Sequence, residues 1–423
     1  MPCYDAAIIG AGPAGLLCAR NAARANLRVA LIDSHEDPGA KLSLAGGGRG
    51  NITNRIIAEN RYISEHPERV RAVLRSFGCE QALDIMRELS LPFEERDFGQ
   101  MFGLRPAFLV AERLAVQCDD AGVDFYLGST ARDITPPSAS SAPAFGRKEE
   151  RRAVFSLLAG RERIEARRLV TATGSPAFPS VGVNTDMIRL AARWGHSIVP
   201  FRPVLTPLVM PQNWPLAGLE GISLNARAGL LREGQELWPD PEGIRPLLFT
   251  HRGISGPAAL VISCWWREGD ELLLDLLPEL SVTELLDARE SGKMLARNIL
   301  ARHLPARLAD ALCPEELARR KAAELSRKDR LRLAEAVHRF RIRPAGTEGL
   351  KKAEAAAGGV SFDSLSRRLE SLVVPGLFFC GEVVDAAGLL GGYNIHWAFA
   401  SGALVAEALK QSLRAERPSG NRA

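Results

Sequence analysis

The sequence lacks any long apolar run, any cysteine cluster and any large excess of one charge. No uninterrupted apolar stretch reaches the roughly 18 residues that a membrane-spanning helix needs, so no span and no membrane partner are predicted. The N-terminus has no basic segment ahead of its first apolar run, so we interpret it as part of the fold and not as a signal peptide. Together these absences favour a cytoplasmic protein.

The seven cysteines are scattered along the chain and form no CxxC pair. Because a zinc site or a catalytic dithiol needs closely spaced thiols, no metal ligands are predicted. Most of the cysteines fall among apolar residues, which is typical of small buried side chains in a reducing compartment.

The charges of the chain nearly cancel. The 54 Lys and Arg residues face 50 Asp and Glu residues, which leaves a formal net charge of +4. The charges are interspersed, so no coherent basic face and no nucleic-acid partner are predicted. The most basic stretch, Arg147–Arg152, is interpreted as a solvated loop. A length of 423 residues exceeds one ordinary core, and two or three domains are expected.

What the sequence does contain is a glycine motif in residues 5–33. A short apolar run leads into Gly10-x-Gly12-x-x-Gly15, an Ala-rich helical stretch follows, and a second apolar run ends at Asp33. The first glycine permits a tight turn, the second lets the backbone approach a pyrophosphate, and the third lets helix and strand pack closely. The helix N-terminus then offers free N–H groups to the phosphates, and Asp33 can bind an adenosine ribose. This βαβ pattern predicts dinucleotide binding, against the alternative of an Ala/Gly-rich core segment.

Three later segments are also rich in glycine and polar residues. Gly46–Asn54 favours a loop against a flat polar ligand, with a flexible surface loop as the alternative. Arg168–Pro176 predicts a buried strand whose terminal turn returns beside the first glycine loop. Gly381–Asn394 follows a predicted strand and opens the last helix, Ala398–Leu409. That helix N-terminus can face the pyrimidine end of a flavin, although an ordinary strand-to-helix connection has the same pattern.

The middle of the chain has a different character. From about Trp194, short Pro-punctuated strands predict an antiparallel sheet or barrel. Residues 281–336 are nearly all helical, and Ser281-x-x-Glu284 forms a capping box. His303 and His338 are expected on the surface of this part, and residues 346–359 are interpreted as a loop.

The glycine-rich segments, together with Thr250–Pro257 and Gly358–Gly359, resemble the BaiN/RdsA-type flavoproteins, also called YhiN-like NAD(P)/FAD-dependent oxidoreductases. The resemblance covers nearly the whole chain and implies an α/β fold with a discontinuous, Rossmann-like FAD-binding domain of the GR2 type. That domain would comprise residues 1–192 and 356–423. The inserted substrate domain, residues 193–355, would combine an antiparallel β-barrel (196–278 and 337–350) with a helical part (280–336). Members of the family include a bile-acid enoyl reductase and an amine oxidase.

The chain departs from this family pattern at two positions. The family commonly has Cys where this sequence has Gly50, so a thiol role there is absent. Asp33 stands where Glu is usual, and both carboxylates can hold a ribose.

The predicted FAD contacts come from every glycine-rich segment and from short neighbouring turns. They are Gly10, Gly12, Pro13, Ala14, Gly15, Asp33, Ser34, Lys41, Gly47, Gly48, Arg49, Asn51, Thr53, Ala131, Thr173, Gly174, Gly381, Glu382, Asp385, Gly391, Gly392, Tyr393 and Asn394. The candidate proton carriers near these motifs are His251, Tyr393 and His396, and His251 is preferred because imidazole titrates near neutrality. A structural role is the alternative for each of them.

These residues predict an FAD-dependent oxidoreductase that transfers hydride between a small organic substrate and the flavin. Because no second GxGxxG motif is present, NAD(P)H would bind transiently as the reductant. The alternatives are an amine oxidase that uses oxygen, a flavin-binding redox sensor without turnover, and an RNA-modifying flavoenzyme. The substrate and the oligomeric state stay open.

Overall fold

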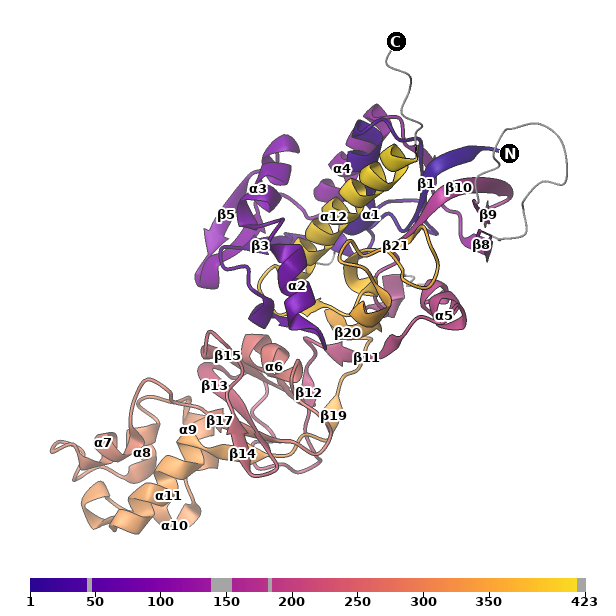
Figure 1. Ribbon diagram of the computed structural model, residues 1–423. Coiled ribbons are helices and arrows are strands. Elements are labelled where there is room, and N and C mark those ends of the chain that lie inside the picture. Colours follow the sequence, from indigo (N-terminus) through magenta and orange to yellow (C-terminus); the bar gives the residue numbers. More distant parts are fainter. Residues whose placement is uncertain (44–47, 138–153, 182–184, 417–423) are drawn as a thin grey trace, which may run out of the picture. The chain divides into compact units, whose positions relative to one another are not determined.

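The computed structural model describes residues 1–43, 48–137, 154–181 and 185–416 (Figure 1). The predicted loop at Arg147–Arg152 and the predicted contact Gly47 therefore lie outside the described residues. The chain divides into two compact units: unit 1 comprises Met1–Arg202 and Glu354–Ala423, and unit 2 comprises Pro203–Ala353. The sequence-based domain limits stood at 192/193 and 355/356. None of the described helices is both long enough and apolar enough to cross a membrane.

Unit 1 is built on a sheet whose middle is parallel. Its strands run in the order β7 (Asp124–Tyr126), β2 (Val29–Ile32), β1 (Cys3–Ile9), β10 (Glu162–Thr171), β9 (Phe155–Ala159) and β8 (Ala131–Thr135), and β21 (Leu377–Phe379) also pairs with β10. The apolar run of β1 is buried on both faces, which explains its lack of hydrophobic alternation. Strands β7, β2, β1, β10 and β21 are parallel, whereas β9 and β8 are antiparallel. The predicted Rossmann-like α/β class is confirmed.

Two helices distant in sequence lie side by side in unit 1. Helix α1 (Pro13–Arg24) follows the first glycine loop, and α12 (Tyr393–Ala415) ends the described chain (Figure 1). A Cβ on Gly402 would lie 2.4 Å from the carbonyl oxygen of Ala14, so glycine allows this close packing. The last helix is longer at both ends than the predicted Ala398–Leu409.

The rest of unit 1 surrounds this core. Its helices are α2 (Pro67–Leu74), α3 (Cys79–Glu88), α4 (Phe108–Asp120) and α5 (Asp186–Arg193). Its remaining strands are β3 (Asn51–Asn54), β6 (Gln100–Gly103) and β5 (Phe93–Arg96) in one sheet, β4 (Tyr62–Ile63) with β22 (Ala387–Gly388), and β11 (Ile198–Val204) with β20 (Ala355–Val360).

The loop predicted for residues 346–359 is wrong over much of its length. It contains the short strand β19 (Gly346–Thr347) and most of β20, whose residues are all buried. Local propensity argued against a strand here, because Ala and Gly are depleted in strands. Tertiary packing outweighs this local propensity. A Cβ on Gly358 would lie 2.6 Å from the carbonyl oxygen of Pro200, so only a residue without a side chain fits against β11.

Unit 2 contains an antiparallel sheet and a helical part. The strands pair in the order β18 (Phe340–Ile342), β17 (Glu271–Asp275), β13 (Ser223–Arg232), β15 (Ile244–Thr250), β16 (Gly253–Ser255), β12 (Leu208–Val209) and β19, with β14 (Gln235–Leu237) on β13. The helices are α6 (Gly256–Ser263), α7 (Val282–Asp287), α8 (Ala296–Leu300), α9 (Ala306–Leu312), α10 (Glu315–Ala318) and α11 (Arg327–His338). The sheet and helices share one apolar core, in which the rings of Trp214 and Phe249 stack with centroids 6.0 Å apart.

His338 was expected on the surface of unit 2, and its contacts show a bridging role as well. His338 is partly buried and bridges elements: its Nδ1 lies 2.9 Å from Asp275 Oδ1, and its Nε2 accepts a hydrogen bond of 3.1 Å from the N–H of Val282. It therefore ties the end of α11 to β17 and α7. His303 is exposed, as expected.

Candidate functional site

The first glycine loop lies at the carboxyl end of the central strand β1. A Cβ on Gly10 would lie 2.4 Å from the carbonyl oxygen of Ala172, and a Cβ on Gly15 would lie 1.8 Å from the carbonyl oxygen of Gly10. These two glycines are therefore required by packing of the protein on itself. A Cβ on Gly12 would meet nothing within 4 Å, so this glycine faces open space at the N-terminus of α1. That helix has no side-chain cap, which leaves its first N–H groups for an anion.

Asp33 supports the same loop from the end of β2. Its Oδ2 accepts a hydrogen bond of 2.6 Å from the N–H of Ala11, and its Oδ1 accepts one of 2.9 Å from the N–H of His35. The His35 ring also lies 2.9 Å from Oδ1. A carboxylate has about four acceptor positions. The ribose contact predicted for Asp33 is therefore compatible with this bracing role.

A second polar cluster joins three distant segments of unit 1. Lys41 Nζ lies 2.6 Å from Glu382 Oε2, and Ser175 Oγ donates a hydrogen bond of 2.7 Å to the same oxygen. Lys41 and Glu382 were predicted contacts, and the structure brings them together. Ser175 was missed, although it directly follows the predicted pair Thr173 and Gly174. Its position immediately after the glycine turn was the available signal.

The N-terminus of α12 is held against β3. Gly392, the residue before the helix, has a left-handed backbone (φ 91°), and a Cβ there would lie 2.4 Å from the carbonyl oxygen of Thr53. Asn54 Nδ2 donates a hydrogen bond of 3.1 Å to the carbonyl oxygen of Gly391. The predicted segments around Asn51–Thr53 and Gly391–Tyr393 are thus neighbours. The helix has no side-chain cap, so a second helix N-terminus is available to a ligand.

Two of the predicted proton carriers are buried in this region. His396 is 0% exposed; its Nδ1 lies 2.8 Å from Thr53 Oγ1, and its Nε2 lies 3.0 Å from the carbonyl oxygen of Phe77. Burial lowers the pKa of His396 to about 4. Tyr393 is also buried, and its carbonyl accepts a 3.1 Å hydrogen bond from Tyr62 Oη. The geometry of His396 favours a structural role, because both ring nitrogens are engaged.

Two predicted contacts also brace neighbouring backbone. Asp385 is buried, and its Oδ2 accepts a hydrogen bond of 3.0 Å from the N–H of Glu65. Burial raises the pKa of this carboxyl group. The side-chain amide of Asn394 accepts from the N–H of Gly388 at 2.7 Å and donates to its carbonyl at 2.9 Å. Any cofactor contact by these two side chains would come in addition to these bonds.

The remaining predicted contacts are distributed as follows. Pro13 and Ala14 are the first two residues of α1, and the N–H of Gly381 donates a hydrogen bond to Ser401 Oγ in α12. Ser34 and Arg49 are exposed, and Gly48 and Ala131 are partly exposed. Gly174 has open space at its Cβ position. His251 belongs to unit 2, in the turn between β15 and β16, where its side chain is 90% exposed and 3.6 Å from Glu220 Oε1. These assignments stay predictions.

The residues around this site fit a flavin dinucleotide. Thr173 Oγ1 and Asn51 Oδ1 are buried and have no hydrogen-bond partner among the described residues. They belong to the turn after β10 and to the β3 segment beside Gly392, where a polar ligand would satisfy them. With the open face at Gly12 and two uncapped helix N-termini, unit 1 offers positions for a diphosphate and for a heterocycle.

The family comparison agrees with this geometry. The model of the HI0933-like protein Rossmann domain matches residues 4–408. The chain belongs to this HI0933-like family. The predicted family is confirmed, and so is the enzyme class, an FAD-dependent oxidoreductase.

Curated members of the HI0933-like family match along nearly the whole chain. The ribosomal RNA dihydrouridine synthase of Escherichia coli K12 is 33% identical over 409 residues, covering 94% of this chain and 96% of the relative. The enzyme of the same name from Haemophilus influenzae is 31% identical, covering 93% and 95%. The 3-dehydro-bile acid delta(4,6)-reductase of Clostridium scindens is 29% identical, covering 97% and 99%.

Among solved structures, a 3-ketosteroid delta1-dehydrogenase from Sterolibacterium denitrificans has a similar fold. The TM-score is 0.51 at 11% identity, and the match covers 97% of this chain and 100% of that one. At this identity the likeness concerns the fold alone.

Gly50, where the resemblance to the BaiN/RdsA-type flavoproteins leads us to expect Cys, can be tested by substitution. Its backbone is left-handed (φ 74°), and a Cβ would lie 3.1 Å from Ala107 Cβ and from Ile52 Cδ1. We expect Gly50→Cys to lower the free energy of unfolding by about 2 kcal/mol, from backbone strain and crowding together. Denaturant unfolding of the FAD-free protein measures this change.

Gly48→Cys is the matched control for Gly50→Cys. Gly48 is also left-handed (φ 87°), but its nearest described neighbour is the carbonyl oxygen of Ser43 at 3.8 Å. We expect it to cost only the backbone strain, about 1 kcal/mol. Equal losses in the two variants would show that the packing against Ala107 does not restrict this position.

Proposed function

We propose that the protein is an FAD-dependent reductase that saturates a carbon–carbon double bond conjugated to a carbonyl group, with a uracil base of ribosomal RNA as its substrate. The observation that carries the proposal is the match to two ribosomal RNA dihydrouridine synthases over nearly the full length of both chains. Dihydrouridine forms when the ring double bond of uridine, which is conjugated to a carbonyl, gains two hydrogen atoms. The proposal replaces the sequence-based expectation that nucleic acid is not a partner.

Unit 1 would hold the cofactor along the polar positions described above. The N-terminus of α1 would bind the diphosphate at Gly12, and Asp33 would bind the ribose. Lys41, Ser175 and Glu382 would contact the ribityl chain. Bound FAD would supply hydride transfer to and from its ring system. The N-terminus of α12 would stabilise negative charge at the pyrimidine end of the ring.

The proposed reaction balances with NAD(P)H as the reductant. NAD(P)H loses a hydride, and the substrate double bond gains a hydride on one carbon and a proton on the carbon next to the carbonyl. The protein must therefore supply or admit one proton. His251 is the predicted carrier with an accessible imidazole, whereas both nitrogens of His396 are engaged.

A small unsaturated carbonyl compound is the second candidate substrate. It is supported by the bile acid reductase of Clostridium scindens, which matches 97% of this chain and 99% of its own length. Its name describes reduction of double bonds in a 3-oxo compound, so the bond type is the same as in uracil. Flavin chemistry and cofactor binding would be shared by both candidates, and only the substrate surface would differ.

The test uses the FAD-loaded protein under anaerobic conditions. We expect NADPH or NADH to bleach the flavin spectrum, and ribosomal RNA from a strain lacking the Escherichia coli relative to reoxidise it. Nucleoside mass spectrometry should then detect dihydrouridine in that RNA. A 3-oxo-4,6-diene bile acid is tested in parallel as the small substrate.

The outcomes separate the alternatives. Reduction of the bile acid alone would replace RNA by a small molecule as the substrate. Flavin that no nicotinamide cofactor reduces, but that an amine reduces with peroxide formation in air, would establish an oxidase. Flavin that no tested reductant cycles would favour a redox sensor.

A further inference from the structure

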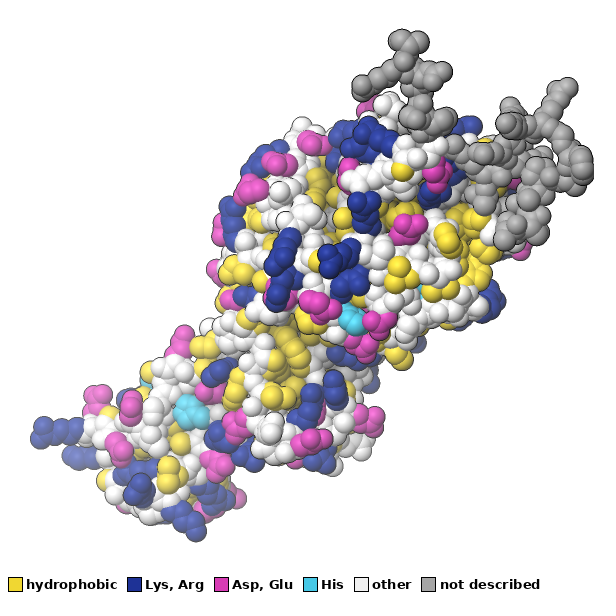
Figure 2. Space-filling view, viewed as in Figure 1, with side chains coloured by type: hydrophobic (Ala, Val, Ile, Leu, Met, Phe, Trp, Pro, Cys, Tyr) yellow, Lys and Arg dark blue, Asp and Glu magenta, His cyan; other side chains and the backbone are white. Residues whose placement is uncertain are grey.

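The positive charge of the chain is concentrated in one part of unit 2. Residues 280–343 contain 15 Lys and Arg against nine Asp and Glu, whereas the rest of the chain contains 39 against 41. The interspersed pattern expected from the whole sequence therefore conceals a local excess, which accounts for all of the net charge of +4. Figure 2 shows Lys and Arg side chains standing out from the part of unit 2 that contains α7 to α11.

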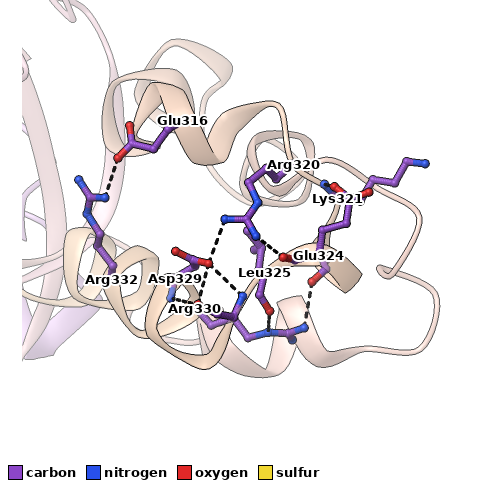
Figure 3. Close-up of polar contacts among 10 residues, drawn as sticks. Glu316, Arg320, Lys321, Glu324, Leu325, Asp329, Arg330 and Arg332 are labelled. Carbon is purple, nitrogen blue, oxygen red and sulfur yellow. Dashed lines mark hydrogen bonds and ion pairs between the residues drawn. The ribbon is translucent and has the colours of Figure 1, made fainter.

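Most carboxylates of residues 280–343 form ion pairs or hydrogen bonds with other residues of the same segment. Arg320 Nη1 lies 3.1 Å from Asp329 Oδ2, Arg332 Nη1 lies 2.6 Å from Glu316 Oε1, and Glu324 accepts a hydrogen bond from the N–H of Lys321 (Figure 3). Arg330 is paired with Asp287. Asp329 also caps α11 together with Ser326. These pairs neutralise the acids and hold the short helices together.

Several exposed cations of residues 280–343 remain outside this internal pairing. We call four of them, Lys293, Lys321, Arg327 and Lys328, the basic surface. None of the four side chains has an ion-pair or hydrogen-bond partner within the described part of the chain. In Figure 3 the Lys321 side chain extends away from the paired residues. Free cations at this density attract a polyanion.

Backbone hydrogen bonds bring the basic surface together. The N–H of Ala322 donates to the carbonyl of Met294 at 2.9 Å, and the N–H of Ala296 donates to the carbonyl of Arg320 at 3.0 Å. Lys293 and Lys321 therefore come from two segments paired side by side. Helix α11 begins six residues after Lys321, and Arg330 Nη2 in this helix donates to the carbonyl of Ala322 at 2.9 Å.

Arg327 and Lys328 occupy the N-terminus of a helix, where positive charge is unfavourable. They are the first two residues of α11, and cations are destabilising at the positive end of the helix dipole. A local rule broken at two adjacent exposed positions points to a function that compensates for it. The helix end itself is already capped by Ser326 and Asp329, so phosphate groups placed beside it would pair with the two cationic side chains.

We infer that the basic surface binds the phosphate backbone of the RNA substrate. This inference rests on the proposed function and adds to it the place where the RNA is held. Lys and Arg without base-reading amides beside them position a nucleic acid through phosphates and carry no sequence information. The surface therefore anchors the RNA, while recognition of the uracil belongs to the flavin site.

The test reverses three charges on the basic surface. In the FAD-loaded protein we expect Lys321→Glu, Arg327→Glu and Lys328→Glu together to weaken binding of a fluorescein-labelled ribosomal RNA fragment at least about ten-fold. The slope of log affinity against log salt, measured between about 50 and 200 mM KCl, should fall by about three. KM for RNA should rise, while flavin bleaching by NAD(P)H stays as in the wild type.

Arg75→Glu, Arg367→Glu and Arg368→Glu together form the matched control. These side chains are exposed in unit 1, and the triple variant changes net charge by the same amount. We expect less than about three-fold weaker binding. Equal weakening in both triple variants, or none in the first, would overturn the inference while leaving the proposed function intact. Wild-type protein that binds anionic phospholipid vesicles but no RNA would overturn both.

Discussion

Replacing Gly12 with Asp is expected to prevent FAD binding while the protein stays folded. Gly12 precedes the first turn of α1, has an ordinary extended backbone (φ −77°, ψ −179°), and leaves open space where a Cβ would stand. An Asp therefore fits without strain. Its carboxylate can cap the free N–H groups of the helix, which stabilises the cofactor-free protein by a few tenths of a kcal/mol.

The same carboxylate would occupy the position proposed for the diphosphate. Two unit charges about 4 Å apart repel by about 4 kcal/mol at an effective dielectric constant of about 20, so FAD affinity should fall by at least about 100-fold. The measurements are the FAD content of the purified protein, the dissociation constant by flavin fluorescence, and the melting temperature without FAD. We expect the first two to change strongly and the third to stay constant or rise.

Gly12→Asn separates charge from bulk in this experiment. Asn has the same size and caps a helix equally well, but it carries no charge. We expect its FAD affinity to lie between those of the wild type and Gly12→Asp. If Gly12→Asp retained FAD at the wild-type level, the diphosphate could not lie at this helix N-terminus, and the proposed cofactor position would be wrong.

The chain fold of unit 1 could be predicted from the sequence because its signals are local. The run before Gly10, the glycine spacing and the run before Asp33 each report on neighbouring residues, and together they specify β1, α1 and β2. The strand at residues 355–360 could not be predicted in this way. Its Ala and Gly residues fit because β11, more than 150 residues earlier, leaves no room for a side chain at Gly358.

The polar contacts of the site likewise divide into those predictable from local sequence and those that depend on tertiary packing. Lys41 and Glu382 could be predicted as members of glycine-rich segments, but their 2.6 Å contact joins positions 341 residues apart. Ser175, which completes the cluster, has no motif of its own. The bridging role of His338 could not be predicted from its charged surroundings in sequence, because its partners Asp275 and Val282 lie on other elements. Sequence patterns identify residue types near a site, and tertiary pairing decides which side chains stay free for a ligand.

Acid is expected to destabilise the protein through His396. Burial lowers the pKa of His396 to about 4, so the ring is neutral near pH 7. Because the Phe77 carbonyl can only accept, Nε2 of the neutral ring carries the hydrogen, and Nδ1 then accepts from Thr53 Oγ1. Protonation would place an uncompensated charge in the core.

The sign of the pH dependence follows from the two states of the chain. An unfolded His has a pKa of about 6.5, so between about pH 6.5 and 4 the unfolded chain binds a proton that the folded chain does not. This contribution to stability is complete above pH 6.5. It falls by about 1.4 kcal/mol per pH unit on acidification and reaches a total loss of about 3 kcal/mol near pH 4.

Comparison of the wild type with His396→Gln isolates this contribution. Gln can accept from Thr53 and donate to Phe77 but does not titrate. Denaturant unfolding at pH 7 and pH 4 should show that the stability advantage of the wild type over the variant shrinks by about 3 kcal/mol, because carboxyl titrations are common to both proteins. His303→Gln, at an exposed position, should show no such change. A pH-independent difference between the wild type and His396→Gln would mean that His396 has the same pKa in the folded and the unfolded chain, and that burial does not hold the imidazole neutral.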